Sequence, residues 1–199
     1  MASTASASYT RIAIALHWLI ALAILSMLAS GWSFDLFADE GTKFALIRLH
    51  KSLGITILLL TLFRLFWRLT HHAPPLPATL PAWEIKSAKI AHILLYVASL
   101  GLPFSGWAMV SASPRNIPTV LFGLVPWPQV PLLQTLEHKK EIAERLGDLH
   151  GIGAALLALL IAGHAAAALR HHFILRNDIL VTMAPRHCAG FLNRIRGRA

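Results

Sequence analysis

Histidine is the residue type whose number and placement in this sequence point to chemistry. The chain has eleven histidines, and five of them lie within long apolar stretches or at their edges, namely His17, His50, His92, His150 and His164. An ionisable side chain within an apolar span is costly and usually marks a function. A single histidine there can instead be a hydrogen-bond partner between helices, so the arrangement of the five decides between the two interpretations.

The segments that carry these histidines are apolar enough to be membrane spans. Of the 199 residues, 56% are hydrophobic and only 14% are charged, whereas about 25% are charged in a soluble domain. A helix needs about 20 apolar residues to cross a bilayer. Four stretches meet this requirement, at about residues 12–34, 46–67, 90–113 and 149–169. The sequence therefore predicts an all-α fold, a single integral membrane domain over residues 1–199 that forms a four-helix bundle.

Lysine and arginine are unevenly distributed between the two sides of this bundle. Eleven of the eighteen belong to the side of the termini and of the connection between the second and third spans. The positive-inside rule then predicts that both termini are cytoplasmic. Residues 174–199 are expected to be a cytoplasmic tail and residues 114–148 an outer-face connection, with a short amphipathic helix at 132–148. The net charge of +9 reflects this topology, and we expect no nucleic-acid partner.

Depth within the bundle groups four of the histidines into two pairs. His150 and His164 are fourteen residues apart, which places them on one helix face and about 21 Å apart along its axis. His50 begins its span on the outer side, level with His150. His17 lies early in its span on the inner side, level with His164. One pair of imidazoles is therefore predicted near each surface.

Two facing imidazoles without further ligands suit a b-type haem. Zinc would need a third or fourth protein ligand, and no carboxylate or thiol is expected at either depth. The single cysteine excludes a CxxCH haem attachment and an iron–sulfur cluster. We therefore expect two haem b groups, with His50 and His150 as axial ligands of the outer iron and His17 and His164 as axial ligands of the inner iron.

Small and basic residues lie near the predicted pairs. Five glycines would let a macrocycle approach the backbone, although helix–helix packing is an equally good explanation for each: Gly31, Gly54, Gly151, Gly153 and Gly163. Arg64 follows His50 by fourteen residues, which places it at the depth of the inner pair. Its guanidinium could bind a haem propionate, or it could simply anchor the positively charged side of the membrane.

Five motifs occur in the order expected of a known family. They are LHW at 16–18, RLHKSLG at 48–54, AHILLY at 91–96, LPFSGW at 102–107 and GHAAAALRHHF at 163–173. From about residue 9 to residue 186, the sequence resembles the bacterial cytochrome b561 family, and within it the superoxide oxidase type. The resemblance implies the same four haem ligands. It also implies oxidation of superoxide at the periplasmic face, with electrons passing through both haems to ubiquinone.

Basic residues around the outer pair could attract superoxide, which is a small anion. Positive potential near a reactive site raises the encounter rate of an anion, and four cations are candidates for such steering: Lys43, Arg48, Lys51 and Arg145. Acidic residues close in sequence could cancel their charge by pairing with them: Asp39, Glu40, Glu141, Glu144 and Asp148.

The quinone is expected on the inner side, because its reduction consumes protons. A histidine can hydrogen-bond a quinone carbonyl and deliver a proton near neutral pH, and His92 and His171 are the candidates. Lys89 and Arg64 are candidates to bind the quinone or a propionate. For His171, an interfacial histidine that marks the end of the helix is the simpler alternative.

Two other classes of function are compatible with histidines buried in a membrane bundle. An electron-transfer cytochrome could link a partner dehydrogenase or hydrogenase to the quinone pool, and residues 114–144 are the candidate docking surface for such a partner. A metal or proton transporter is disfavoured, because the sequence shows neither internal repeats nor acidic residues within the spans.

Overall fold

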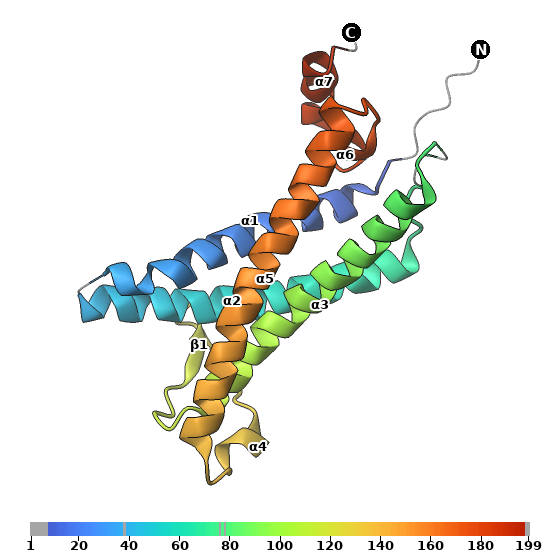
Figure 1. Ribbon diagram of the computed structural model, residues 1–199. Coiled ribbons are helices and arrows are strands. Elements are labelled where there is room, and N and C mark those ends of the chain that lie inside the picture. Colours follow the sequence, from blue (N-terminus) through green and yellow to red (C-terminus); the bar gives the residue numbers. More distant parts are fainter. Residues whose placement is uncertain (1–7, 38, 76, 78, 198–199) are drawn as a thin grey trace.

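Four long helices dominate the computed structural model, which describes residues 8–197 except 38, 76 and 78 (Figure 1). They are α1 (Arg11–Ser33), α2 (Glu40–Thr70), α3 (Ala82–Ala112) and α5 (Lys139–Phe173), and a short 3-10 helix η1 (Phe34–Leu36) follows α1. Each long helix is apolar and long enough to cross a membrane. The start of α1 and the end of α5 lie at one end of the bundle (Figure 1), which we call the terminal end. We call the opposite end the hairpin end.

Capping residues and prolines determine where the helices begin and end. The Thr10 hydroxyl accepts a hydrogen bond from the Ala13 amide at 3.2 Å and caps α1. The Asp39 carboxylate accepts one from the Thr42 amide at 2.7 Å and caps α2. Hydrogen bonds from Thr42 to this carboxylate hold the pKa of Asp39 below its usual value. After α2 ends, prolines in the segment 73–81 prevent the helix from continuing.

The segment that connects α3 to α5 differs in part from the sequence expectation. Only α4 (Pro131–Gln134) forms a separate short helix there. The amphipathic helix expected at 132–148 is wrong in its bounds, because residues from Lys139 onward are the first turns of α5. No proline interrupts the chain between Lys139 and Phe173, so the helix is continuous and spans about 52 Å at 1.5 Å per residue.

A small antiparallel hairpin departs from the expected all-α architecture. Strand β1 (Thr119–Leu121) pairs with β2 (Val125–Trp127). Phe122 and Gly123 between them have φ values of 52° and 75°, as a type I′ turn requires. The Phe122 amide donates a hydrogen bond to Ser52 Oγ of α2 at 2.9 Å, and Trp107 Nε1 of α3 donates to the Pro128 carbonyl at 2.8 Å. The hairpin is thereby fixed across this end of the bundle.

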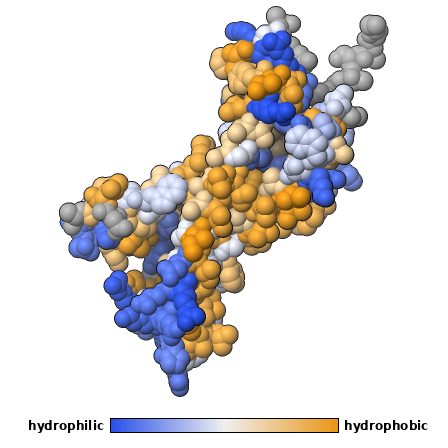
Figure 2. Space-filling model, in the orientation of Figure 1, coloured by the Kyte–Doolittle hydropathy of each residue, from blue (hydrophilic) through white to orange (hydrophobic). Residues whose placement is uncertain are grey.

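The long helices pack in a consistent order around a small apolar core. α1 packs on α2, α2 on α3, and α3 most extensively on α5. The core contains Ile24 of α1, Ile57 of α2 and Leu157 of α5. Large apolar side chains elsewhere on these helices point outward, and they colour much of the surface of the bundle orange in Figure 2. An apolar exterior of this kind is the surface expected of a bundle surrounded by lipid.

Two short helices follow α5 at the terminal end. They are α6 (Ile179–Thr182) and α7 (Arg186–Ile195), and both belong to the segment 174–199 that we expected to be a tail. Its last two residues, 198 and 199, lie outside the described part of the chain.

Candidate haem-binding sites

The outer pair of histidines lies near the hairpin end. The imidazoles of His50 (α2) and His150 (α5) face each other with ring centres 6.2 Å apart. A metal ion bonded to one nitrogen of each ring at about 2.0–2.1 Å would separate the ring centres by about 6 Å. The spacing therefore fits two axial ligands of one iron. Among the described residues, no group of three or more possible metal-ligating side chains is found.

Each outer imidazole is oriented by a serine from a neighbouring helix. Ser30 Oγ lies 3.0 Å from His50 Nδ1, and Ser105 Oγ lies 3.0 Å from His150 Nδ1. Both serine hydroxyls donate to backbone carbonyls of their own helices, so each accepts a hydrogen bond from the histidine. The Leu102 carbonyl, 3.1 Å from His150 Nδ1, can likewise only accept. Protonated Nδ1 atoms leave Nε2 of both rings with a free lone pair, which is the state that binds a metal.

A cavity of about 480 Å³ between the helices is lined by both outer histidines, His50 and His150. Its volume lies within the range of about 300–1,000 Å³ typical of ligand and cofactor sites. Gly31, Gly54 and Gly151 line it, as does Gly106, which the sequence analysis did not single out. A Cβ atom at Gly106 would lie 3.0 Å from His150 Cε1. The absence of side chains at these positions thus keeps the ligand ring and the cavity clear.

The remaining two glycines do not contribute to this cavity. A Cβ atom at Gly153 would lie 2.9 Å from Leu102 Cδ2, so Gly153 permits close packing of α5 on α3. Gly163 has open space around its Cα atom.

The inner pair lies toward the terminal end and includes a third imidazole nearby. The ring centres of His17 (α1) and His164 (α5) are 6.3 Å apart, nearly the same spacing as in the outer pair. His92 of α3 contacts the His164 ring edge-on, with centres 5.5 Å apart. The structure therefore brings together both pairs expected from depth, and it places His92 directly beside the inner one.

Arg64 also lies at the inner end of the bundle. Its Nη1 donates to the Ala13 carbonyl at 3.0 Å. Together with Arg68 and Tyr96, Arg64 lines a small cavity of about 20 Å³. The Tyr96 hydroxyl is buried and has no hydrogen-bond partner in the described structure. A carboxylate or carbonyl oxygen would satisfy this group, and the position of Tyr96 one helical turn after His92 is the sequence signal that could have revealed it.

His171 belongs to a separate polar cluster further along α5. Its Nε2 lies 3.7 Å from Glu84 Oε2 of α3, and its Nδ1 lies 2.9 Å from Asn177 Nδ2. Arg170 contacts the other oxygen of Glu84 at 3.1 Å. Lys89 is exposed on α3, and within the described residues no hydrogen bond or ion pair joins it to this cluster or to the inner histidines.

The four cations near the outer pair have different surroundings. Lys51 lines the cavity between His50 and His150, and its Nζ donates to the Pro118 carbonyl at 3.4 Å. Arg48 lies 6.0 Å from the ring centre of Phe44. Arg145, in contrast, pairs with Glu141 at 2.6 Å, and Lys43 lies two turns before His50 on α2. The charge of Arg145 is therefore neutralised by an acidic residue, whereas Lys51 lies at the cavity between the outer histidines.

Facing imidazoles inside a bundle of four apolar helices are the arrangement of a membrane b-type cytochrome. Residues 8–186 match the family model described as prokaryotic cytochrome b561. The chain belongs to the prokaryotic cytochrome b561 family, whose members are membrane electron-transfer proteins with b-type haem.

Named relatives are similar to this protein over most of its length. It is 30% identical to cytochrome b561 homolog 1 of Escherichia coli K12 over 183 residues, which cover 89% of this chain and 97% of the relative. It is 33% identical to cytochrome b561 homolog 2 of the same organism over 177 residues, 88% of this chain and 90% of the relative. It is also 27% identical to a protein of Yersinia pestis named probable superoxide oxidase CybB over 181 residues, 89% and 96% of the two chains.

Proposed function

We propose that this cytochrome oxidises superoxide at the hairpin end and reduces ubiquinone at the terminal end, with haem b at both histidine pairs. The observation that carries the proposal is the placement of His150 and His164 on one face of α5, each opposite an imidazole from another helix. Two such sites on one helix make a route across the bundle. The name of the Yersinia pestis relative supports superoxide as the electron donor.

The overall reaction balances without a further co-reactant. Two superoxide anions each lose one electron and become molecular oxygen. One quinone takes up both electrons and two protons and becomes a quinol. A b haem held by two imidazoles supplies reversible uptake of a single electron.

The outer residues bind and admit the anion. Lys51 places an ammonium group at the edge of the cavity beside His50, and Arg48 lies one turn earlier on the same helix. Positive charge here raises the local concentration of superoxide. A small diatomic anion needs no elaborate pocket, so attraction to the cavity edge is sufficient for recognition.

The inner residues bind the quinone and manage its protons. His92 adjoins the inner pair, and its imidazole would hydrogen-bond a quinone carbonyl. The buried Tyr96 hydroxyl and Arg64 supply further donors for a carbonyl or a propionate. The His171–Glu84 pair lies further toward the terminal end and would pass protons from the aqueous side. Lys89 would contribute positive potential at the entrance.

The orientation of the bundle follows from its charge. Eleven of the eighteen lysines and arginines belong to the terminal side. By the positive-inside rule this excess supports an orientation with both termini in the cytoplasm and the hairpin end in the periplasm, as we propose for a bacterial inner membrane. Proton uptake for quinol formation would then come from the cytoplasm.

The test measures quinol formation by the haem-loaded protein in liposomes that contain ubiquinone. An enzymatic source of superoxide should produce one quinol for every two superoxide anions consumed, and added superoxide dismutase should abolish the quinol. A haem-loaded protein that forms no quinol with superoxide would overturn the proposal. That result would favour the alternative, a relay between a partner dehydrogenase or hydrogenase and the quinone pool.

A further inference from the structure

Helix α7 is a strongly amphipathic element at the end of the chain. It comprises Arg186–Ile195, whereas the family match ends at residue 186. The proposed electron-transfer function uses none of its side chains. We therefore consider which side chains of α7 contact the bundle and which are exposed.

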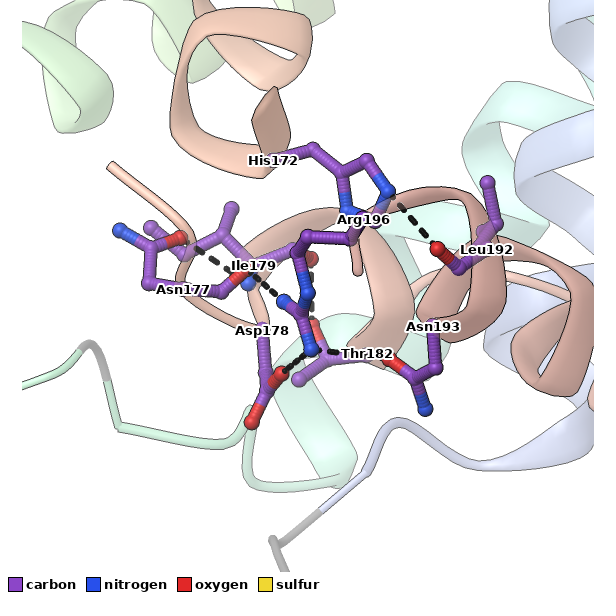
Figure 3. Close-up of polar contacts among 8 residues, drawn as sticks. All are labelled: His172, Asn177, Asp178, Ile179, Thr182, Leu192, Asn193 and Arg196. Atoms are coloured by element: carbon purple, nitrogen blue, oxygen red, sulfur yellow. Dashed lines mark hydrogen bonds and ion pairs between the residues drawn. The ribbon is translucent and has the colours of Figure 1, made fainter. Parts of the chain in front are cut away.

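One face of α7 is anchored to the end of α5 (Figure 3). The buried Arg196, which directly follows α7, donates to the Asn177 carbonyl at 2.5 Å and to Asp178 Oδ1 at 2.6 Å. The fully buried His172 lies 3.2 Å from the Leu192 carbonyl through its Nε2. These contacts hold α7 in one position against the bundle, so the same side chains of its opposite face always point away from the bundle.

The position of α7 is close to the membrane boundary. Trp18, next to the inner ligand candidate His17, donates a hydrogen bond from Nε1 to the Met183 carbonyl at 2.9 Å. The chain thus returns toward the bundle three residues before α7 begins. Figure 1 shows α7 beyond the end of α5, at the terminal end of the bundle. A helix held at this level, just beyond the end of α5, lies within reach of the lipid headgroups.

The free face of α7 combines apolar and basic side chains. Phe191 is 60% exposed and Ile195 is 45% exposed, and they lie one turn apart on the same stripe. Exposed His187 and Arg194 flank them. Figure 2 likewise shows orange and blue side chains adjacent at this end of the molecule.

The charge of the whole segment favours an anionic partner. Residues 170–199 contain six arginines and one acidic residue, Asp178. Arg170 pairs with Glu84 and the buried Arg196 with Asp178, whereas Arg194 is exposed on the free face of α7. An amphipathic helix with an apolar stripe and basic flanks lies in the lipid interface, and its strength of binding grows with the anionic charge of the lipid. The bilayer that surrounds the neighbouring spans would bring such lipid within reach of α7.

We propose that α7 is an interfacial helix whose Phe191 and Ile195 insert among lipid headgroups while Arg194 binds the headgroup phosphates of anionic phospholipids. The helix thereby fastens the terminal end of the bundle to the membrane surface. This inference does not depend on which donor or acceptor the cytochrome uses.

The experiment uses the full-length, haem-loaded protein with a spin label on a single cysteine. Cys188 is the only cysteine, so Cys188→Ser supplies the background and Phe191→Cys the labelling site. The control label replaces Lys140 at the hairpin end, where the native side chain is 81% exposed. Accessibility to oxygen and to a water-soluble nickel chelate is measured in nanodiscs of phosphatidylcholine and of an equal mixture with phosphatidylglycerol.

The label at 191 should favour oxygen over the chelate in the anionic bilayer, more strongly than in the neutral one, and the label at 140 should favour the chelate in both. Adding Arg194→Gln should lower the ratio of inserted to free helix by about fivefold in the anionic bilayer. Chelate accessibility at 191 equal to that at 140 would overturn the proposal. Equal insertion in both lipids would overturn the role of anionic headgroups, and dipolar broadening between labels would indicate a second copy as the partner instead.

Discussion

The Ser105 hydroxyl of α3 lies 3.0 Å from Nδ1 of His150 on α5, although the two residues are 45 positions apart in the chain. Ser30 stands in the same relation to His50. Each outer imidazole is thus fixed in orientation by a helix that supplies no ligand of its own to that pair. Partners of this kind raise the basicity of a ligating imidazole and hold its ring in place.

Loss of the Ser105 hydroxyl should weaken the outer site. We expect Ser105→Ala to lower haem affinity there by about tenfold rather than to abolish binding, because the Leu102 carbonyl still accepts from His150. The inner site should stay intact, because Ser105 bonds a ligand of the outer pair. Haem content per protein and the b-band spectrum measure this. Ser26→Ala is the matched control, since the Ser26 hydroxyl bonds only its own helix; an equal loss in both variants would contradict the assigned role.

A methyl group at Gly106 should also disturb the outer site. Its Cβ would lie 3.0 Å from His150 Cε1, so the ring must move away from its position opposite His50. Gly106→Ala should therefore lose about one of two haems. Gly101→Ala, on the same helix but with open space around its Cα atom, should retain both haems. A full haem complement in Gly106→Ala would show that His150 does not need a residue without a side chain beside its ring.

Single ligand substitutions should separate the two haems. His17→Ala or His164→Ala should remove the inner haem alone, and His50→Ala or His150→Ala the outer one alone. The physical reason is that an apolar core of Ile24, Ile57 and Leu157 lies between the pairs, so each site keeps its own ligands and walls. Haem quantification of the four purified variants checks this, and loss of both haems from a stably folded single variant would count against two independent sites.

The charge at Lys51 should affect the rate of reaction with superoxide. Lys51→Gln removes a cation that lines the outer cavity, and we expect the second-order rate constant to fall by about three- to tenfold and to become less dependent on ionic strength. Arg145→Gln should have little effect, because Arg145 is already paired with Glu141. Equal rates in Lys51→Gln and in the unmodified protein would exclude steering by this residue.

Substitution of His92 should impair quinone reduction specifically. His92→Ala removes the imidazole beside the inner pair without removing a predicted ligand, so superoxide should still reduce the haems while reoxidation by quinone slows about tenfold or more. His171→Ala tests the proton route through Glu84 and should slow the same step, most strongly at high pH. Normal reoxidation of the haems by quinone in both variants would contradict a quinone site beside His92.

Regular spacing made the main features predictable from sequence. Two residues fourteen positions apart on a helix lie on the same face and about 21 Å apart along its axis. Once the topology gave the depths of His17 and His50, the positions of His150 and His164 on one helix were enough to predict the two pairs. Apolar composition over whole helical lengths likewise predicts four spans, because a helix that crosses the bilayer needs about 20 predominantly apolar residues.

Contacts between distant segments were not predictable in the same way. A serine in an apolar helix usually bonds its own backbone, so nothing in the sequence marked Ser30 or Ser105 as partners of histidines. Glu84 meets His171 only because α3 and α5 are neighbours. The hairpin depends on positive φ at Phe122, a residue type that rarely adopts it.

The most direct test of the central claim is an optical spectrum of the purified, oxidised protein during exposure to an enzymatic source of superoxide. We predict rapid appearance of the reduced b-type α-band and its reversal when ubiquinone is added. A haem-loaded protein whose spectrum does not respond to superoxide would contradict the proposed reaction, and a protein that binds no haem would contradict the assignment of the histidine pairs.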